Sequence, residues 1–193
     1  RRFRYALLAF DLITVAFIVV TSFLPRTPLI EVLDAVFGLA ILVDFSSRMW
    51  IARRPWHELT LPATWADIIA ILSFLAPVVG EGAAFLRVMR TVRLLRTYHI
   101  AKQLRQDFKW FRRNEDIVLA AVNLFVFIFI MTAIVYETQH GVNPQIAHYA
   151  DALYFTVTAV APTGVGDITL PGTTGRMISV VIMILGVTLF LNL

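Results

Sequence analysis

Basic residues recur at every third position along one stretch of the chain, and such a row of charges can respond to an electric field. The positions are Arg87, Arg90, Arg93, Arg96, His99, Lys102 and Arg105. An arginine at the centre of a bilayer helix costs about 2.5–3.5 kcal/mol, so four arginines in one mostly apolar segment need a compensating role. Each charge that crosses the full field contributes about 2.3 kcal/mol per 100 mV. We therefore predict that the four arginines are voltage-sensing charges, and that the last three basic residues lead into a cytoplasmic linker.

The spacing also predicts how these positions are arranged. In an α-helix, a three-residue step turns successive positions by about 60°, so the row is expected to wind around the helix as a steep spiral. A basic helix that lies on the membrane surface and binds anionic lipid is the alternative. Such a helix would gather its charges on one face and would need no acidic residues in neighbouring spans.

Acidic residues do lie in the preceding apolar segments, where they are the expected partners of the arginines. Asp34 and Asp44 are ten residues apart, about 15 Å along a helix, and Asp67 lies in the next segment. Asp11 in the first segment is a further candidate. Because Asp44 and Arg48 are spaced i, i+4, a local ion pair is the alternative for Asp44.

The composition indicates a membrane protein. The chain of 193 residues is 59% hydrophobic and 16% charged, with a mean hydropathy of +0.76, which is too apolar for a soluble domain. It has no cysteine, which excludes disulfides and thiolate chemistry. The net charge of +4 comes from clusters beside apolar segments and from the basic row, so no nucleic-acid partner is predicted.

Six apolar segments are long enough to cross a hydrocarbon core of about 30 Å. They are residues 5–24, 29–52, about 62–79, 83–104, 116–136 and 174–193. Residues 147–160 are apolar but too short to span, which favours a re-entrant helix. Basic clusters precede the first span, follow the second and separate the fourth from the fifth, so this side is expected to be cytoplasmic. The chain is thus predicted to be a multi-pass protein of the cell membrane with a cytoplasmic N-terminus, and to be a fragment, since it ends inside an apolar run.

A glycine-bearing loop follows the short apolar segment: Thr163-Gly164-Val165-Gly166-Asp167. Glycine accepts backbone dihedral angles that other residues avoid, so alternating glycines can turn successive carbonyls to one side. A ring of such strands can replace the hydration shell of a cation. One chain supplies one strand, so a closed pore needs several copies, and four are expected. The carboxylates of Asp167 would then form a ring that concentrates cations.

Together these residues resemble the voltage-gated potassium channel superfamily of six-transmembrane, prokaryotic type, over nearly the whole chain. Asp34 and Asp44-Phe45-Ser46-Ser47-Arg48 match its two acidic positions, and Trp65-Ala66-Asp67-Ile68-Ile69-Ala70 is similar to its third-span motif. Asp151-Ala152-Leu153-Tyr154-Phe155 through Asp167 aligns without gaps to its pore helix and filter.

This resemblance implies an all-α membrane protein with a four-helix voltage-sensor bundle in residues 1–100 and a cytoplasmic linker helix in residues 101–115. Residues 116–193 would form the pore domain, with an outer helix, a re-entrant pore helix, a filter loop and a truncated inner helix. It further implies a homotetramer in the lipid bilayer that passes monovalent cations. Potassium would bind at the filter carbonyls of Thr163, Gly164 and Val165, and Gly186 would be the inner-helix hinge. Close helix packing is the alternative role of Gly186.

Three positions depart from the family pattern. Ile41 stands where an aromatic plug of the charge-transfer site is usual. Pro162, in the run Ala159-Val160-Ala161-Pro162, replaces a threonine and has neither hydroxyl nor amide N–H. Val165 replaces an aromatic residue whose hydroxyl braces the filter. Potassium conduction is therefore predicted with an altered filter, and a non-selective or sodium- or calcium-permeable channel is the alternative.

Other classes fit the sequence less well. A cyclic-nucleotide-regulated relative would carry its ligand domain beyond Leu193. A transporter or a sensor-linked enzyme explains neither the short helix nor the glycine loop. No catalytic constellation is visible, the four histidines lack metal-site spacing, and no cofactor is expected apart from permeant K⁺ or Na⁺.

Overall fold

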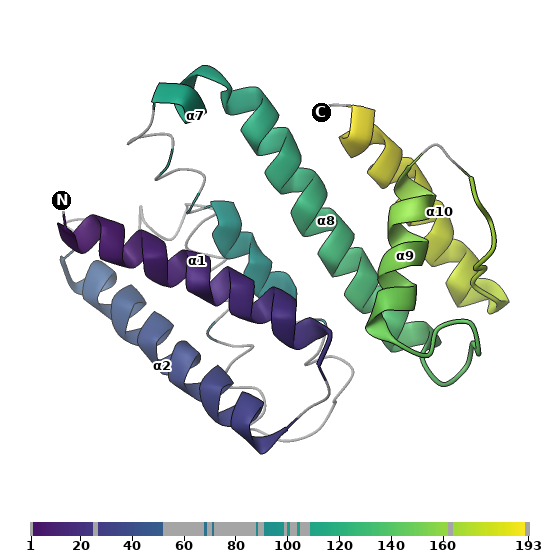
Figure 1. The fold of residues 1–193 in the computed structure, drawn as a ribbon, viewed down its shortest axis with the longest axis horizontal. Coiled ribbons are helices and arrows are strands. Elements are labelled where there is room, and N and C mark those ends of the chain that lie inside the picture. Colours follow the sequence, from purple (N-terminus) through teal and green to yellow (C-terminus); the bar gives the residue numbers. More distant parts are fainter. Residues whose placement is uncertain are drawn as a thin grey trace. The chain divides into compact units, whose positions relative to one another are not determined.

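The computed structural model describes residues 2–24, 27–51, 68, 71, 88, 91–98, 100, 104, 109–161 and 164–191. Its elements are α1 (Arg2–Ser22), α2 (Pro28–Ile51), the 3₁₀ helix η1 (Arg93–Arg96), α7 (Lys109–Arg113), α8 (Glu115–Gln139), α9 (Tyr149–Val160) and α10 (Gly172–Leu191) (Figure 1). No strand occurs among these residues, so the expected all-α fold is confirmed. The chain divides into two compact units, unit 1 (Arg1–Ile100) and unit 2 (Ala101–Leu193).

Four of the six predicted spans are helices in the structure. Residues 5–24, 29–52, 116–136 and 174–193 correspond to α1, α2, α8 and α10, and the short segment 147–160 corresponds to α9. Helix α8 continues to Gln139, three residues past its predicted end, because the first helix breaker after it is Gly141, where φ is +86°. The predicted span 62–79 and most of the span 83–104 lie outside the described residues.

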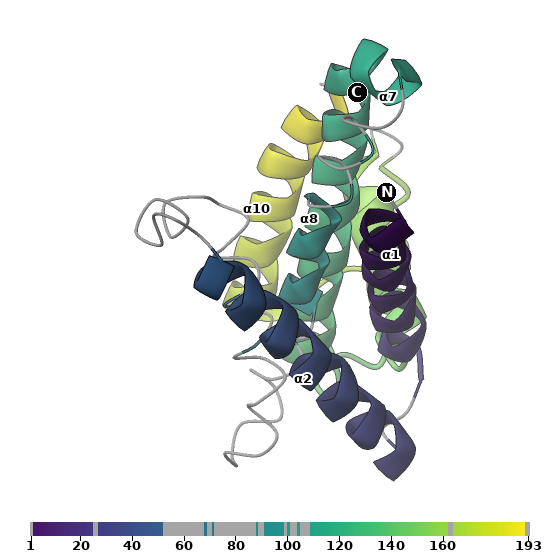
Figure 2. The same cartoon turned by 90° about the vertical axis from the view of Figure 1, so that its left-hand side faces the viewer.

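In unit 1, aromatic side chains of α1 and α2 contact one another; Figure 2 shows the ribbons of the two helices. Phe37 of α2 stacks on Phe17 of α1 with 4.8 Å between ring centroids, and it lies 5.9 Å from the Phe10 ring. Beside these rings, Ile41 and Ile71 are buried together in one apolar cluster. This cluster fixes the face that α2 turns toward the rest of unit 1.

The outer face of α2 is apolar and its inner face carries an acid. Val32, Val36, Leu39 and Val43 form a stripe with exposed fractions of about 60%. Asp34, on the opposite face, is only 2% exposed. A soluble helix shows the reverse pattern, with charged residues outside and apolar residues inside. The distribution is therefore that of a helix whose outer face contacts lipid.

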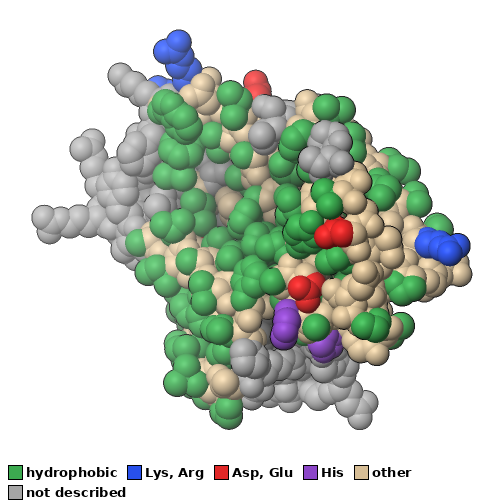
Figure 3. All heavy atoms as spheres, turned by 45° about the vertical axis from the view of Figure 1, so that its right-hand side comes forward, with side chains coloured by type: hydrophobic (Ala, Val, Ile, Leu, Met, Phe, Trp, Pro, Cys, Tyr) green, Lys and Arg blue, Asp and Glu red, His purple; other side chains and the backbone are tan. Residues whose placement is uncertain are grey.

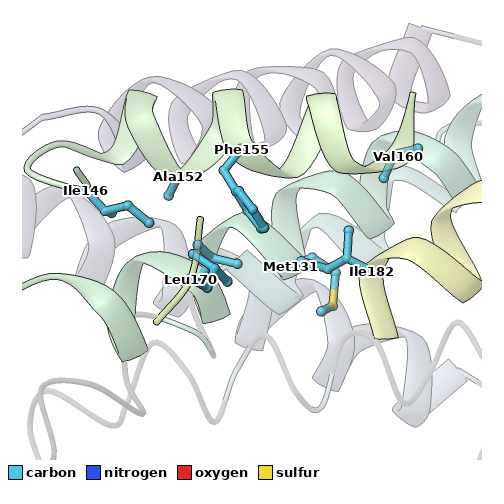
Figure 4. Packing of buried hydrophobic residues seen from close by; sticks show 8 residues of the cluster. Met131, Ile146, Ala152, Phe155, Val160, Leu170 and Ile182 are labelled. Carbon is cyan, nitrogen blue, oxygen red and sulfur yellow. The ribbon is translucent and has the colours of Figure 1, made fainter. Parts of the chain in front are cut away.

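In unit 2, α8, α9 and α10 enclose one apolar core. Its buried members are Met131, Val135, Ile146, Ala152, Phe155, Val160, Leu170 and Ile182. Figure 4 shows Phe155 and Val160 projecting from α9 toward this core. Within the described part of the chain, α8 and α10 are the two helices long and apolar enough to cross a membrane. Hydrophobic side chains also cover much of the described surface in Figure 3.

Gly186 lies where α10 approaches its neighbours most closely. A Cβ atom there would lie 2.5 Å from Cγ2 of Val160 and 3.2 Å from Cε1 of Phe127. Gly186 is buried, and its missing side chain lets α10 pack on both α8 and α9. The sequence left two roles open for Gly186, a hinge and close helix packing. These contacts are those expected for close helix packing.

The substitution Gly186→Ala is expected to destabilise unit 2, because the new methyl group overlaps Val160. Overpacking of this kind costs about 1–3 kcal/mol. Thermal unfolding of the purified protein in detergent measures the loss. Adding Val160→Ala removes the clashing methyl groups and should recover part of the lost stability. If the double variant loses as much stability as the two single variants together, the contact between Gly186 and Val160 is refuted.

Candidate functional site

The basic row passes through a 3₁₀ helix. Arg93 and Arg96 are the first and last residues of η1, and Leu94 between them is fully buried. A 3₁₀ helix has three residues per turn, so positions i and i+3 lie directly above one another. The spiral expected for an α-helix is therefore wrong for this pair, whose positions share one side of the helix. Arg87 and Arg90 lie outside the described residues.

Among the described residues of unit 1, two aspartates are buried within helices. Asp34 of α2 and Asp11 of α1 are 2% and 5% exposed, while Asp44 is half-buried. A buried charge is stable only when it is paired, so both sites suit a cationic partner. Asp11, which the sequence offered only as a further candidate, is buried nearly as deeply as Asp34 and more deeply than Asp44. Asp67 lies outside the described residues.

Ile41 is fully buried and lies seven residues after Asp34, which is two helical turns along the same face of α2. It packs with Ile71 and with partly buried Phe10, Phe37 and Phe45. The position expected to be the plug is thus part of a dry apolar layer between the level of Asp34 and that of Asp44.

The loop between α9 and α10 has the backbone that alternating glycines permit. Gly164 and Gly166 have φ values of +56° and +66°, in the left-handed region, and residues 164–167 are exposed. A side chain at either position would be strained whatever the space around it. Left-handed backbone angles, which glycine accepts, are thus present at Gly164 and Gly166. Pro162 and Thr163 lie outside the described residues.

Helix α9 is fixed at its start by an acidic cap. The Asp151 carboxylate accepts hydrogen bonds from the backbone N–H groups of Ala147 (3.0 Å) and His148 (2.7 Å). The last residue of α9, Val160, is buried in the core of unit 2. Because a helix C-terminus carries a partial negative charge, this end of α9 favours a cation near the start of the loop.

Side chains that the sequence did not single out hold the far end of the loop. The Tyr154 hydroxyl of α9 faces the Asp167 carboxylate, and this interaction raises the pKa of Tyr154 above its usual value. Gln145 and Asn143, from the segment that connects α8 to α9, bond the backbone of Asp167 and Thr169. No local pattern marks these residues, because their partners are 13 to 26 positions away in the chain.

A cavity of about 710 Å³ lies behind the loop. Phe155 and Thr158 of α9, Val165 of the loop, and Ser179 and Met183 of α10 are among its lining residues. Val165, at the position of the aromatic residue expected from the family pattern, is exposed beside this pocket.

Comparison with known proteins agrees with this arrangement. The model of the family described as "Ion transport protein" matches residues 2–193. A curated protein of Methanocaldococcus jannaschii, the "Hyperpolarization-activated voltage-gated potassium channel", is 30% identical over 114 residues. The match covers 58% of this chain and 53% of the relative, so it spans about half of that protein's length.

A glycine pair tests the role of the loop backbone. Gly166 and Gly172 both have positive φ values, +66° and +78°, and neither would create a steric clash as alanine. Gly166→Ala and Gly172→Ala should each lower stability by about 1–2 kcal/mol, the cost of a left-handed alanine. If the loop binds cations, added KCl stabilises the wild type and Gly172→Ala in a thermal-shift assay but has less effect on Gly166→Ala. Equal responses of both variants would count against a cation site at the loop.

Proposed function

Because the chain belongs to the ion transport protein family, within the voltage-gated channel superfamily, we propose that it forms a voltage-gated cation channel that conducts potassium. The observation that carries the proposal is the pair of left-handed glycines, Gly164 and Gly166, between a half-length helix and a helix long enough to span the membrane. Current through the purified protein in planar bilayers, recorded during voltage steps with ion substitution, tests it.

We assign voltage sensing to unit 1. Arg87, Arg90, Arg93 and Arg96 are the moving charges, and Asp34, Asp44 and Asp67 are their countercharges. The buried carboxylate of Asp34 and the apolar layer around Ile41 support this assignment, because charges pass most readily through a thin dry layer with acids on both sides. The 3₁₀ segment also supports it, since positions three residues apart then line up along the direction of movement.

We assign the pore to unit 2, repeated in four copies around a central axis. In this proposal α8 and α10 span the membrane, α9 is the re-entrant pore helix, and the N-terminus is cytoplasmic. Permeant cations bind at the carbonyls of Thr163, Gly164 and Val165, without any further cofactor. A hinge at Gly186 would have to open its contact with Val160, so bending there is coupled to the end of the pore helix.

A non-selective channel, or one that passes sodium or calcium, is the second candidate. Pro162 and Val165 favour it, because neither residue can supply a hydroxyl at its position in the filter. The printed function of the Methanocaldococcus relative favours potassium. Its name also says that it opens on hyperpolarisation, so voltage steps of both signs are needed to find the gating direction of this chain.

Neutralising the central arginines should flatten the voltage dependence. The double variant Arg90→Gln, Arg93→Gln removes two of four predicted charges per subunit, each contributing about 2.3 kcal/mol per 100 mV when it crosses the full field. The slope of the conductance–voltage curve should fall to about half. Arg53→Gln with Arg54→Gln removes as much charge outside the expected field and should leave the slope alone. An unchanged slope in the first variant would refute the sensor assignment.

Restoring the usual filter residues should sharpen selectivity. Pro162→Thr with Val165→Tyr adds one hydroxyl at the inner end of the filter and an aromatic ring beside the cavity that Val165 lines. Reversal potentials in mixed K⁺ and Na⁺ should move toward the potassium equilibrium potential. The permeability ratio of K⁺ over Na⁺ should rise about tenfold or more, because each restored hydrogen bond contributes about 1 kcal/mol. The same ratio before and after would show that these positions do not set selectivity.

A further inference from the structure

One side chain ties the segment between α8 and α9 to the far end of the loop. Gln145 Nε2 donates a hydrogen bond to the carbonyl oxygen of Asp167 at 3.0 Å, and Gln145 Oε1 accepts one from the N–H of Thr169 at 3.2 Å. A carboxamide can do both at once, because its donor and its acceptor lie in one rigid plane. Gln145 thus pairs with two backbone groups as the peptide group of a neighbouring strand would.

Asn143 holds this side chain in place. It is 5% exposed, and its Oδ1 accepts a hydrogen bond from the backbone N–H of Gln145 at 3.1 Å. Its Nδ2 donates to the carbonyl of Thr169 at 2.8 Å, so the loop end is bonded at a second point. The N–H of Asn143 in turn donates to the carbonyl of Gln139 at 2.8 Å, at the last residue of α8. A continuous series of hydrogen bonds therefore joins α8 to Thr169.

Both sides of the bridge are anchored in the same apolar core. Ile146, next to Gln145, is fully buried, and Leu170, next to Thr169, is 5% exposed. Both belong to the cluster that packs α8, α9 and α10 together. Gln145 itself is exposed, so its bonds do not serve to satisfy buried groups. They fix the distance between the segment that connects α8 to α9 and the end of the loop, each of which is anchored in the core by its neighbouring residue.

We propose that Gln145 is a positioning residue of the permeation pathway, which holds the outer end of the filter by fixing the peptide groups at Asp167 and Thr169. The inference rests on the proposed channel function. Val165 cannot brace the filter through a hydroxyl, so the outer end carries more of that task. Without the hydrogen bonds of Gln145, the Asp167 peptide can rotate. The carbonyl oxygens before it then lose the orientation in which they replace the ion's hydration shell.

The test compares sustained currents of the full chain in planar bilayers. Gln145→Leu removes both bonds, and Gln145→Glu keeps an acceptor for the Thr169 N–H but has no donor for the Asp167 carbonyl. Val142→Ala is the matched control, since Val142 is an exposed residue of the same segment. Size-exclusion chromatography and thermal unfolding confirm that each variant assembles and folds.

We expect the current of Gln145→Leu to decline about tenfold faster than that of the wild type during a held step, because two hydrogen bonds of ordinary net strength are lost. Gln145→Glu should fall between them, and Val142→Ala should match the wild type. Raising the outer K⁺ concentration tenfold should slow the decline in Gln145→Leu, because an ion bound in the filter stabilises the conducting form.

The outcomes separate the two claims. A wild type that conducts, together with a Gln145→Leu variant of unchanged decline, overturns the positioning role and leaves the proposed function standing. A faster decline that outer K⁺ does not alter also overturns the role, because it places the defect away from the ion. A wild type that passes no cation current refutes the proposed function, and the positioning role with it.

Discussion

The cost of placing polar groups where no water can reach them constrains every part of this chain. An unpaired polar group in an apolar medium loses several kcal/mol, so the helices satisfy theirs internally. Thr14, Thr132, Thr156 and Thr188 each donate their hydroxyl to the carbonyl four residues earlier. The buried carboxylates of unit 1 face the same requirement with a full charge. Helix α2 carries Asp34 inward and valines outward, a distribution that suits a lipid environment.

The sequence was sufficient wherever a feature depends on local composition. Apolar length predicted α1, α2, α8 and α10, and the short run before the glycines predicted α9. The left-handed backbone at Gly164 and Gly166 followed from their spacing, because few other residues adopt such angles. The acids of α2 were also visible, since a charge in an apolar segment is conspicuous.

Features that depend on tertiary packing could not be predicted from the sequence. Gln145 and Tyr154 look like ordinary loop and helix residues, and only the folded chain brings them to Asp167. The role of Gly186 could not be chosen between bending and packing until Val160 was found against it. The 3₁₀ helix was missed for the same reason, because propensity alone favours an α-helix in a segment rich in arginine and leucine.

In the loop between α9 and α10, side-chain hydrogen bonds are made near the end that joins α10. Val165 lines a pocket beside the loop, while Asn143 and Gln145 make hydrogen bonds with the backbone of residues 167 and 169. The end of the loop that joins α10 is therefore held by one exposed side chain, Gln145, and one buried side chain, Asn143.

The 3₁₀ helix has a geometric consequence for the length of the segment that contains it. Each residue of a 3₁₀ helix rises about 2.0 Å, against about 1.5 Å in an α-helix. The four residues of η1 are therefore about 2 Å longer than they would be in α-helical form. If the 3₁₀ stretch moved along the chain by one turn, the residues between its old and new places would shift along the axis while both ends of the helix stayed fixed. A change of pitch that travels along this segment would thus displace the residues it passes without changing the total length of the helix.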